Sequence, residues 1–395
     1  LSSKPCVVVV GNGMVGCKFL EKLVELGGTD VFEIIAIGEE PQAAYDRVRL
    51  SAYFDGTTLE ELSLQSLEWY SNNSIDLRLS TQVNGICREE QELFLDNGDT
   101  LNYDFLVLAT GSSPFVPPIP GNEKEGVFVY RTIEDLDSIT EYAKSCKHGT
   151  VLGGGLLGLE AANAVLSLGL ETTVVEFAPR LMPRQLDDDG AEFLKTKIEE
   201  LNIEVLVSKA TKSIDGERCV DGLTFSDDTT LDTDMLVISA GIRPRDSLAR
   251  DGGLALGERG GVIVDEHMRT SDPLIFAIGE VALVNGMIYG LVAPGYDMAA
   301  VVANLLMAEP KSFHAADMST KLKLLGVDVA SFGDAMGTTE GCRPMVLQNS
   351  HEGIYKRLNV SADGTKLLGG ILVGDAEDYN SLLQMVKNDM VLPPS

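Results

Sequence analysis

We predict from the sequence an α/β fold made of two strand–turn–helix–strand units and a smaller third domain. The prediction depends on two glycine-rich segments, GNGMVG at residues 11–16 and GGGLLG at residues 153–158. Each segment follows an apolar run typical of a buried strand and begins a helical pattern. In each unit an acidic residue follows the next predicted strand, Glu39 after EIIAIG and Glu176 after TTVV.

This pattern is the fingerprint of a dinucleotide-binding site. Glu39 lies 23 residues after Gly16, and Glu176 lies 18 residues after Gly158, close to the spacing of roughly 20 in the fingerprint. The glycines let the backbone approach a pyrophosphate at a helix N-terminus, and the carboxylate accepts hydrogen bonds from a ribose. Two complete fingerprints in one chain predict electron transfer between two dinucleotides, FAD and NAD(P)H. The predicted pyrophosphate contacts are Gly11, Gly13 and Gly16 for FAD and Gly153, Gly155 and Gly158 for NAD(P)H.

The first part of the chain alternates strands and helices. Residues 1–38 predict a β-α-β unit, residues 59–72 a helix, and residues 75–107 short strands. The apolar run FLVLATGSSP at residues 105–114 predicts a strand that leads into a loop. The segment PFVPPIPG at residues 114–121 holds too many prolines for a helix or an inner strand, so we interpret it as a crossing between domains.

The next part repeats this plan. A helix at residues 133–146 precedes the second βαβ unit, and AGIRP at residues 240–244 follows a strand as ATG does in the first unit. IFAIGE at residues 275–280 predicts a strand that ends at a glycine and an acid, and a helix at residues 293–307 begins with APG. Between these segments we predict a helix at residues 188–201 and strands at 204–207, 223–225 and 235–239.

From about Met318 the pattern becomes β-rich. Strands are predicted for the segments KLKLLGVDVASFGD, YKRLNVS and LLGGILVGD. A hairpin turn is predicted for ADGT at residues 362–365, and a helix for residues 377–388. We therefore predict two Rossmann-like domains, the FAD domain interrupted by the NAD domain, and a small C-terminal α+β domain. The predicted domains are residues 1–118 with 245–316 for FAD, 119–244 for NAD(P)H, and 317–395 for the C-terminal domain.

Composition narrows the expected partners. The 395 residues carry a formal net charge of −29, which argues against nucleic acids and anionic membranes because both repel an acidic surface. No apolar run approaches the roughly 20 residues of a membrane helix. The six cysteines include no CxxC pair, and the four histidines are scattered. We expect a cytoplasmic protein with reduced thiols and no metal site in this chain.

The order of motifs carries a resemblance to a known family. In chain order the motifs are a GxGxxG segment, ATG, a second GxGxxG segment, AGxRP, and a strand that ends in AxG and an acidic residue. Together they span nearly the whole chain. This order resembles the flavoproteins that include disulfide reductases, NADH oxidases, and rubredoxin and ferredoxin reductases. Several segments are more closely similar to the FAD/NAD(P)H part of the assimilatory NAD(P)H-nitrite reductase large subunit. These segments are AYDRVRLS (44–51), YRTIEDLD (130–137), VVEFAPRLMPRQLD (174–187), RTSDPLIFAIGE (269–280), YGLVAPGYDMA (289–299) and STKLKLLGVDVASFGD (319–334).

The resemblance implies an electron-input module with FAD as cofactor and NADH as substrate. In that family an iron–sulfur domain and a sirohaem domain follow the flavin part and reduce nitrite, and this chain holds no cysteine cluster for them. Iron–sulfur and sirohaem centres are therefore expected only in parts absent from this chain. The implied electron acceptor is those downstream domains or a separate small iron–sulfur protein. A homodimer is compatible with the sequence.

The resemblance also implies roles for residues around the FAD. The N-terminus of the helix at residues 293–307 faces the flavin pyrimidine edge, where a helix stabilises negative charge by roughly 0.3–2 kcal/mol. The acid after IFAIG is Glu280 where Asp is common in the family, and its alternative role is that of a capping or solvated acid. The implied contacts are Glu39 at the adenosine ribose, Ala109, Thr110 and Gly111 beside the nucleotide, Gly279 and Glu280 at a ribityl hydroxyl, and Pro294 and Tyr296 at the helix start.

Two arginines and a glutamate are implied near the redox centre. Arg47 and Arg131 are candidates for the surround of the isoalloxazine, and Glu160 reaches the flavin–nicotinamide stack, where it pairs with Arg47. The alternative for all three is an ordinary surface position. Related reductases carry a lysine where this sequence has Ala52, which leaves the partner of Glu160 open.

The thiol chemistry of the family is not expected here. Disulfide reductases carry a CxxxxC pair, and NADH oxidases carry a single cysteine near residues 41–44, whereas this sequence has neither. Glu176 predicts a preference for NADH over NADPH, because a carboxylate suits a ribose diol and repels a 2′-phosphate. Arg180 and Arg184 either offer charge to a 2′-phosphate or are solvated.

Three functions follow as hypotheses. The first is the NADH-oxidising flavin module of nitrite reductase. The second is a free-standing NADH-dependent rubredoxin or ferredoxin reductase, which clustered cysteines encoded downstream would distinguish from the first. The third is a flavin-binding protein used for redox sensing or interaction, which rapid NADH turnover with an artificial acceptor would contradict.

Overall fold

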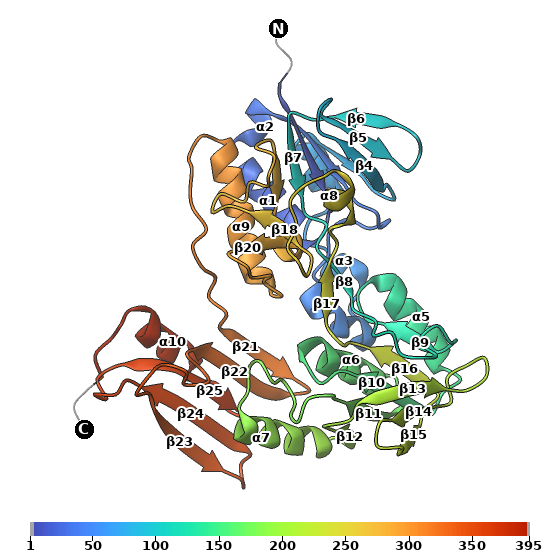
Figure 1. The fold of residues 1–395 in the computed structure, drawn as a ribbon, viewed down its shortest axis with the longest axis vertical. Helices are drawn as coiled ribbons and strands as arrows, with labels where there is room; N and C mark the ends of the chain where they lie inside the picture. The colour runs from blue at the N-terminus through green and yellow to red at the C-terminus, as the bar shows by residue number, and fades with distance from the viewer. Residues whose placement is uncertain (1–3, 393–395) are drawn as a thin grey trace. The chain divides into compact units, whose positions relative to one another are not determined.

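The computed structural model describes residues 4–392. The chain forms two compact units, Leu1–Ser113 with Ile242–Ala316 and Pro114–Gly241 with Asp317–Ser395, and each is described by itself. Two parallel sheets flanked by helices and a separate C-terminal antiparallel sheet confirm the predicted fold class (Figure 1). The three domain ranges remain a prediction, and their outer ends at residues 1–3 and 393–395 lie outside the described residues.

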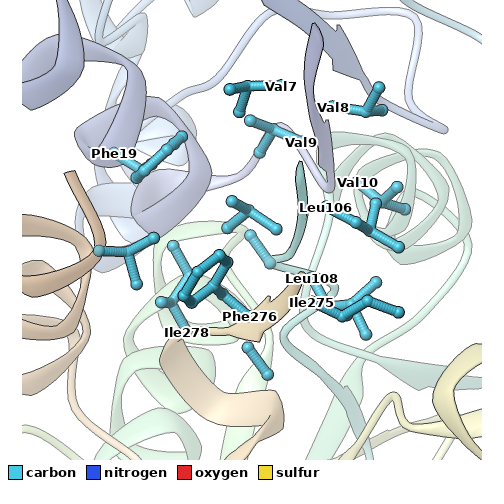
Figure 2. Packing of buried hydrophobic residues seen from close by; sticks show 14 of the residues in the cluster. Val7, Val8, Val9, Val10, Phe19, Leu106, Leu108, Ile275, Phe276 and Ile278 are labelled. Atoms are coloured by element: carbon cyan, nitrogen blue, oxygen red, sulfur yellow. The ribbon is translucent and has the colours of Figure 1, made fainter. Parts of the chain in front are cut away.

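The first unit is built on a five-stranded parallel sheet with the strand order β19-β7-β1-β2-β3. Its strands are almost wholly apolar because both faces of the sheet are covered. Figure 2 shows Val7 and Val9 of β1 near Phe19 of the helix α1, with Leu106 and Phe276 of neighbouring strands in the same cluster. The strands are β1 (Cys6–Val10), β2 (Glu33–Ile37), β3 (Ile75–Arg78), β7 (Phe105–Leu108) and β19 (Ile275–Ala277).

Two long helices of this unit, α1 (Met14–Glu25) and α9 (Val292–Leu306), pack against each other. The helix predicted at residues 59–72 is instead two short helices. The cause is Ser66, whose hydroxyl accepts the Trp69 N–H and so starts a new helix. The other elements are α2 (Gly28–Val31), η1 (Arg47–Asp55), α3 (Leu59–Leu62), α4 (Leu67–Asn72), β4 (Val83–Cys87), β5 (Glu92–Leu95), β6 (Thr100–Asn102), α8 (Ser247–Asp251), β18 (Val262–Val264), η2 (Gly279–Val281) and β20 (Ala282–Val284).

The second unit contains another five-stranded parallel sheet, ordered β12-β11-β10-β16-β9. The helix α6 (Leu156–Ser167) packs on β10 and β11. The chain passes between the units along β8 (Ser112–Pro114) and β17 (Ile242–Pro244), which pair with each other. The remaining elements are β9 (Val127–Val129), α5 (Ile133–Ala143), β10 (His148–Leu152), β11 (Glu171–Val175), α7 (Asp188–Glu199), β12 (Ile203–Leu206), β13 (Thr211–Asp215), β14 (Gly222–Phe225), β15 (Thr230–Asp232) and β16 (Met235–Ile238).

The C-terminal sheet is antiparallel, in the order β21-β22-β25-β24-β23. The segment KLKLLGVDVASFGD is a hairpin rather than one strand, because Leu325 and Gly326 have φ of 50° and 83° and form a tight turn. The ADGT turn is confirmed by the Gly364 N–H, which donates to the Ser361 carbonyl over 2.8 Å. Strand β23 was not predicted. The elements are β21 (Thr320–Leu324), β22 (Val327–Gly333), β23 (Arg343–Asn349), β24 (Ile354–Val360), β25 (Leu367–Val373) and α10 (Tyr379–Lys387).

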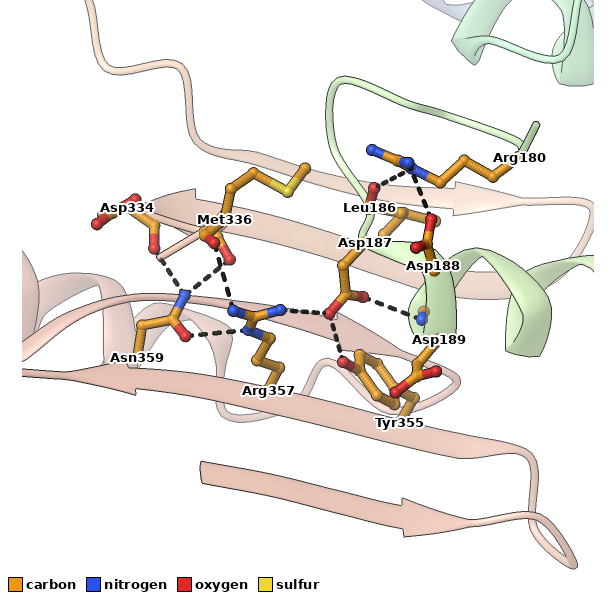
Figure 3. A network of polar contacts seen from close by, with 12 residues as sticks. Arg180, Leu186, Asp187, Asp188, Asp189, Asp334, Met336, Tyr355, Arg357 and Asn359 are labelled. Carbon is orange, nitrogen blue, oxygen red and sulfur yellow. Dashed lines mark hydrogen bonds and ion pairs between the residues drawn. The ribbon is translucent and has the colours of Figure 1, made fainter. Parts of the chain in front are cut away.

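A buried polar network joins α7 to the C-terminal sheet (Figure 3). Asp187 caps α7 by accepting the Gly190 N–H over 3.0 Å, and it also accepts the Tyr355 hydroxyl over 2.6 Å and the Arg357 guanidinium over 2.8 Å. The Arg357 Nε donates to Asn359 over 3.0 Å. One residue therefore holds both the start of α7 and strand β24 of the C-terminal sheet.

Burial by itself would raise the pKa of Asp187, but the hydrogen bonds from Tyr355, Arg357 and Gly190 outweigh it and hold this pKa below its ordinary value. A carboxylate whose folded pKa is depressed stabilises the fold above its unfolded pKa, about 4, and loses that contribution as the pH falls through the folded pKa. The network is therefore intact at neutral pH.

We predict that Arg357→Ala lowers the free energy of unfolding by about 2 kcal/mol at pH 7, because it leaves the Asp187 carboxylate mostly buried without its cation. The effect shrinks as the pH falls below the unfolded pKa of an aspartate, about 4, and it is lost as the pH falls through the lower folded pKa of Asp187. Urea denaturation followed by circular dichroism at pH 7 and pH 3.5 measures both values.

The control is Lys366→Ala, which removes an exposed ion pair between the residue before β25 and Asp389 after α10 and should change stability by less than about 0.5 kcal/mol. Equal effects of the two substitutions would contradict the importance of the network.

Candidate functional site

The three glycines of the first fingerprint meet different surroundings. A Cβ added to Gly11 would lie 2.2 Å from the Ala109 carbonyl oxygen, and one added to Gly16 would lie 2.0 Å from the Gly11 carbonyl oxygen. A Cβ added to Gly13 would meet nothing within 4 Å. Packing of the protein itself therefore requires the first and third glycines. The middle glycine leaves open the space in which a pyrophosphate would approach.

The second fingerprint repeats this geometry. A Cβ on Gly153 would lie 2.1 Å from the Ser239 carbonyl oxygen, and one on Gly158 would lie 1.9 Å from the Gly153 carbonyl oxygen. Gly155 again faces open space. The two segments are therefore the same structural device, each at the carboxyl end of the central strand of a parallel sheet.

The helices that begin at these segments have no side-chain cap. Helices α1 and α6 start after Gly13 and Gly155, and α9 starts after Leu291, with no acidic residue in any of the three first turns. By contrast, α5 and α7 are capped by Thr132 and Asp187. Uncapped N–H groups at the positive end of a helix dipole form a binding site for an anion such as a diphosphate.

The acidic residue of the second fingerprint, Glu176, is oriented by backbone N–H groups. One oxygen of Glu176 accepts the Gly154 N–H over 2.5 Å, and the other accepts the Ala178 N–H over 2.7 Å. Its carboxylate therefore lies beside the glycine turn, and its contact with a ribose stays a prediction. Arg180 donates instead to Asp188 over 2.9 Å and to the Leu186 carbonyl over 3.0 Å (Figure 3). The guanidinium of Arg180 is thus occupied at the start of α7.

The acidic residue of the first fingerprint, Glu39, is held by Arg245, a residue that the sequence patterns did not indicate. Both oxygens of Glu39 pair with the guanidinium of Arg245, one of them over 2.6 Å. This hydrogen-bonded pair lowers the pKa of Glu39, so the carboxylate stays ionised. The backbone of Arg245 is fixed to the ATG segment, since its N–H donates to Gly111 over 2.9 Å and its carbonyl accepts the Thr110 hydroxyl over 2.8 Å.

The start of α9 meets the first fingerprint. A Cβ on Gly295 would lie 2.6 Å from a methyl carbon of Val15, the residue between Gly13 and Gly16. Gly279 has a φ of 76° and also contacts Val15. The Ser112 hydroxyl donates to Glu280 over 2.7 Å, and the ammonium of Lys18 lies 5.4 Å from the centre of the Tyr296 ring. Gly279 and Gly295 therefore lie beside Val15, and Tyr296 lies beside Lys18 of α1, whereas the cofactor contacts of Glu280 and Pro294 stay predictions.

Arg47 is held by residues that follow β2. Its guanidinium pairs with Glu40, the residue after Glu39, and lies 5.0 Å from the centre of the Tyr45 ring. The Tyr45 hydroxyl donates to the same carboxylate over 2.7 Å. Glu160 belongs to the other unit, so its pairing with Arg47 stays a prediction.

In the second unit the segment after β9 borders the start of α6. Arg131 donates its backbone N–H to Asp135 over 3.1 Å, which places it at the N-terminus of α5. The neighbouring Tyr130 is 5% exposed, and its hydroxyl has no hydrogen-bond partner among residues 4–392. Burial and then the charge of Glu160 raise the pKa of Tyr130. Sequence reasoning missed Tyr130, whose only signal was its place at the carboxyl end of a strand.

Burial lowers the reactivity of two thiols in the first unit. All six cysteines are free, and burial raises the pKa of Cys17 to about 12 and that of Cys6 to about 11. A protonated thiol is a poor nucleophile. Residues 4–392 contain no group of three or more His, Cys, Asp or Glu side chains that could hold a metal ion, and no helix among them is both long and apolar enough to cross a membrane.

We predict that Gly13→Ala and Gly155→Ala separate the two binding sites. Each Cβ fits the protein, so stability should change by less than about 1 kcal/mol, but each occupies the approach of one diphosphate. Gly13→Ala should weaken FAD binding at least tenfold and leave NADH binding unchanged, and Gly155→Ala should do the reverse. Flavin fluorescence and NADH titration measure the two affinities, and thermal denaturation confirms folding.

The matched controls are Gly16→Ala and Gly158→Ala, which should destabilise the chain itself because their Cβ atoms meet backbone oxygens within about 2 Å. Tight FAD binding by Gly13→Ala would contradict the location of the site.

Comparison with known proteins agrees with this geometry. Residues 5–317 match the pyridine nucleotide-disulphide oxidoreductase family, and residues 319–390 match the rubredoxin NAD+ reductase C-terminal domain. The chain is 55% identical over 391 residues to the nitrite reductase [NAD(P)H] large subunit of Klebsiella oxytoca, which covers 99% of this chain and 41% of the relative. It is 47% identical to the nitrite reductase (NADH) large subunit of Escherichia coli (strain K12), with 99% and 46% covered.

Solved structures share the fold. A ferredoxin reductase from Rhodopseudomonas palustris superposes with a TM-score of 0.88 at 27% identity, covering 99% of this chain and 96% of that one. The chain thus spans less than half the length of these two nitrite reductase relatives, but nearly all of this reductase. Since one family matches 313 consecutive residues that contain both fingerprints, the chain belongs to the pyridine nucleotide-disulphide oxidoreductases, which are FAD-dependent oxidoreductases of NAD(P)H.

Proposed function

We propose that this chain is the NADH-oxidising flavoprotein module of a nitrite reductase, which passes electrons from NADH through FAD to an iron–sulfur and sirohaem partner. The observation that carries the proposal is that the same arrangement occurs twice in one chain. Each copy has a middle glycine that faces open space, a helix without a side-chain cap, and an acidic residue after the next strand. The identity of 55% to a nitrite reductase large subunit supports this particular partner. Cytoplasmic location and a homodimer remain part of the proposal.

The first unit holds the residues that would bind FAD. The uncapped N–H groups of α1 at Gly13 would bind the diphosphate, and Glu39 would bind the adenosine ribose. Thr110 and its neighbours Ala109 and Gly111 would line the nucleotide, and Glu280 would bind a ribityl hydroxyl. The N-terminus of α9, at Pro294 and Tyr296, would stabilise negative charge on the pyrimidine edge of the reduced cofactor. When bound, FAD would accept two electrons from NADH and release them one at a time.

The second unit would bind NADH. Gly155 and the start of α6 would hold the diphosphate, and Glu176 would hold the adenosine ribose. In this proposal Glu160, Arg47 and Arg131 orient the nicotinamide against the flavin, so that catalysis is mainly positioning. No acid–base group is required for hydride transfer.

A second candidate is a free-standing reductase of a small iron–sulfur protein. Two observations favour it, the match of residues 319–390 to a rubredoxin NAD+ reductase C-terminal domain and the likeness over 96% of a ferredoxin reductase. A redox-sensing role without turnover is the third. Stopped-flow oxidation of NADH by the FAD-loaded chain tests the third, and reduction of added rubredoxin or ferredoxin tests the second.

We predict that the purified chain binds FAD noncovalently, is yellow, and prefers NADH to NADPH. The Glu176 carboxylate accepts ribose hydroxyls and repels a 2′-phosphate. Glu176→Ala should narrow the ratio of kcat/KM for the two substrates by about tenfold, which corresponds to roughly 1.4 kcal/mol. Steady-state kinetics with ferricyanide as acceptor give the ratio.

The control is Glu171→Ala at the opposite end of the same strand, which should leave the ratio unchanged. A preference for NADPH in the unmodified chain would overturn the proposal for Glu176.

We also predict that the FAD-loaded chain reduces ferricyanide with NADH but produces no ammonium from nitrite. The conversion of nitrite to ammonium takes six electrons and a metal centre that binds the substrate, and these belong to the proposed partner. Ammonium is measured after incubation with NADH and nitrite, with ferricyanide reduction as the positive control. Catalytic ammonium formation by this chain alone would mean that it contains its own nitrite site.

A further inference from the structure

Phe177, the residue directly after Glu176, carries an exposed aromatic ring. Its side chain is 76% exposed, the largest exposed fraction of any large apolar side chain among residues 4–392. A single exposed apolar residue on a protein surface needs no ligand to explain it. In the case of Phe177, however, the fixed backbone and the place of the residue beside a predicted ribose contact both point to a ligand.

The backbone on both sides of Phe177 is held in place. The Glu176 N–H donates to the Leu206 carbonyl over 2.8 Å, and the Ala178 carbonyl accepts the Ser208 N–H over 2.9 Å. The Ala178 N–H also donates to the Glu176 carboxylate over 2.7 Å. The ring therefore extends from a segment of fixed backbone, and its exposure is a property of the fold and not of a free loop.

The sheet order indicates which part of NADH would lie beside this ring. The diphosphate is proposed at Gly155, after β10, and the adenosine ribose at Glu176, after β11. The next strand in this direction is β12, at the edge of the sheet. Because a dinucleotide binds across the carboxyl ends of the strands, the adenine lies beyond the ribose, at the ends of β11 and β12. Phe177 follows β11, and its Cα lies about 3.8 Å from that of Glu176.

An exposed phenyl ring suits the adenine better than it suits the other parts of the dinucleotide. The diphosphate needs hydrogen-bond donors, and the ribose needs partners for its hydroxyls. The adenine offers a flat aromatic face, which stacks on aromatic side chains and removes apolar surface of both rings from water.

We propose that Phe177 is a binding residue for the adenine of NADH, which stacks on the phenyl ring while Glu176 holds the adenosine ribose. The inference rests on the NADH site proposed above and extends it to the base. The adenine does not change during hydride transfer, so the stacking contributes equally before and during the reaction. Its loss should therefore raise KM and leave kcat unchanged.

The first test compares NADH with reduced nicotinamide mononucleotide, which lacks the adenosine half. Both are assayed with the FAD-loaded chain and ferricyanide as acceptor. Phe177→Ala should lower kcat/KM for NADH about tenfold through KM, which lies in the lower part of the range for stacking of a base on an aromatic side chain. The same variant should leave kcat/KM for the mononucleotide unchanged. Phe177→Trp should retain the affinity for NADH, and Phe177→Leu should show an intermediate loss.

The second test measures binding without turnover. ADP-ribose contains the adenosine and the diphosphate but no nicotinamide, and calorimetry gives its affinity for the FAD-loaded chain. Phe177→Ala should weaken the binding of ADP-ribose about tenfold. The sequence has one tryptophan, Trp69, so Phe177→Trp adds a fluorophore at the proposed site. ADP-ribose should quench the fluorescence of this variant more strongly than that of the unmodified chain.

The matched control is Phe94→Ala, which removes the same ring from β5 in the other unit, where it is 43% exposed. This variant should bind NADH and ADP-ribose as the unmodified chain does. Thermal denaturation of Phe177→Ala should show an unchanged Tm, because the deleted ring is mostly exposed.

The contrary results are distinct. Unchanged affinity of Phe177→Ala for ADP-ribose would overturn the inference, and tighter binding would show that the ring obstructs the site. Equal losses of kcat/KM for NADH and for the mononucleotide would also overturn it, because the effect would then not depend on the adenine. If ADP-ribose binding depends on Phe177 but the chain does not reduce ferricyanide with NADH, the inference holds and the proposed function fails.

Discussion

Each dinucleotide fingerprint depends on a backbone contact that no residue with a side chain can make. Gly16 lies against the Gly11 carbonyl and Gly158 against the Gly153 carbonyl, with room for hydrogen atoms only. This contact sets the first turn of the helix directly at the end of its strand. The free N–H groups of that turn then face the open space beside the middle glycine, and the rest of each site is arranged around that space.

The acidic residues of the two fingerprints, Glu39 and Glu176, are held in place in two different ways. Glu176 accepts backbone N–H groups of Gly154 and Ala178, so its orientation follows from the local fold of the loop. Glu39 depends instead on the side chain of Arg245, which comes from the segment that returns to the first unit. The contacts of Glu39 are therefore complete only after the chain has passed through the second unit.

Local patterns predicted most of the fold, because the period of buried residues and the glycine turns act within a few residues. The helices at 188–201 and 293–307 were located within two residues of α7 and α9. The helix at 59–72 was wrong because a serine cap interrupts an otherwise helical pattern. Strand β23 was missed because six of its seven residues are exposed, so the sequence shows no alternation.

The residues of the candidate site were also predictable where they depend on local sequence, and not where they depend on contacts between distant segments. The glycines and acids of the fingerprints were found because their spacing is local and each geometry needs a particular residue type. Arg245 and Tyr130 were not found because their roles depend on contacts across the fold: the pair with Glu39 spans 206 residues, and the burial of Tyr130 reflects packing around α6. An arginine or a tyrosine in a loop has no sequence signal that reveals such a partner.

The cysteine beside the first glycine turn shows the same close packing. Cys17 directly follows Gly16, and it lies fully buried against Tyr70, whose hydroxyl is 3.6 Å from its sulfur. Burial raises its pKa to about 12, so at neutral pH it is a protonated, apolar filler of the core. Cys17 therefore contributes packing rather than reactivity beside the first glycine turn, and it helps to hold α1 at the end of β1.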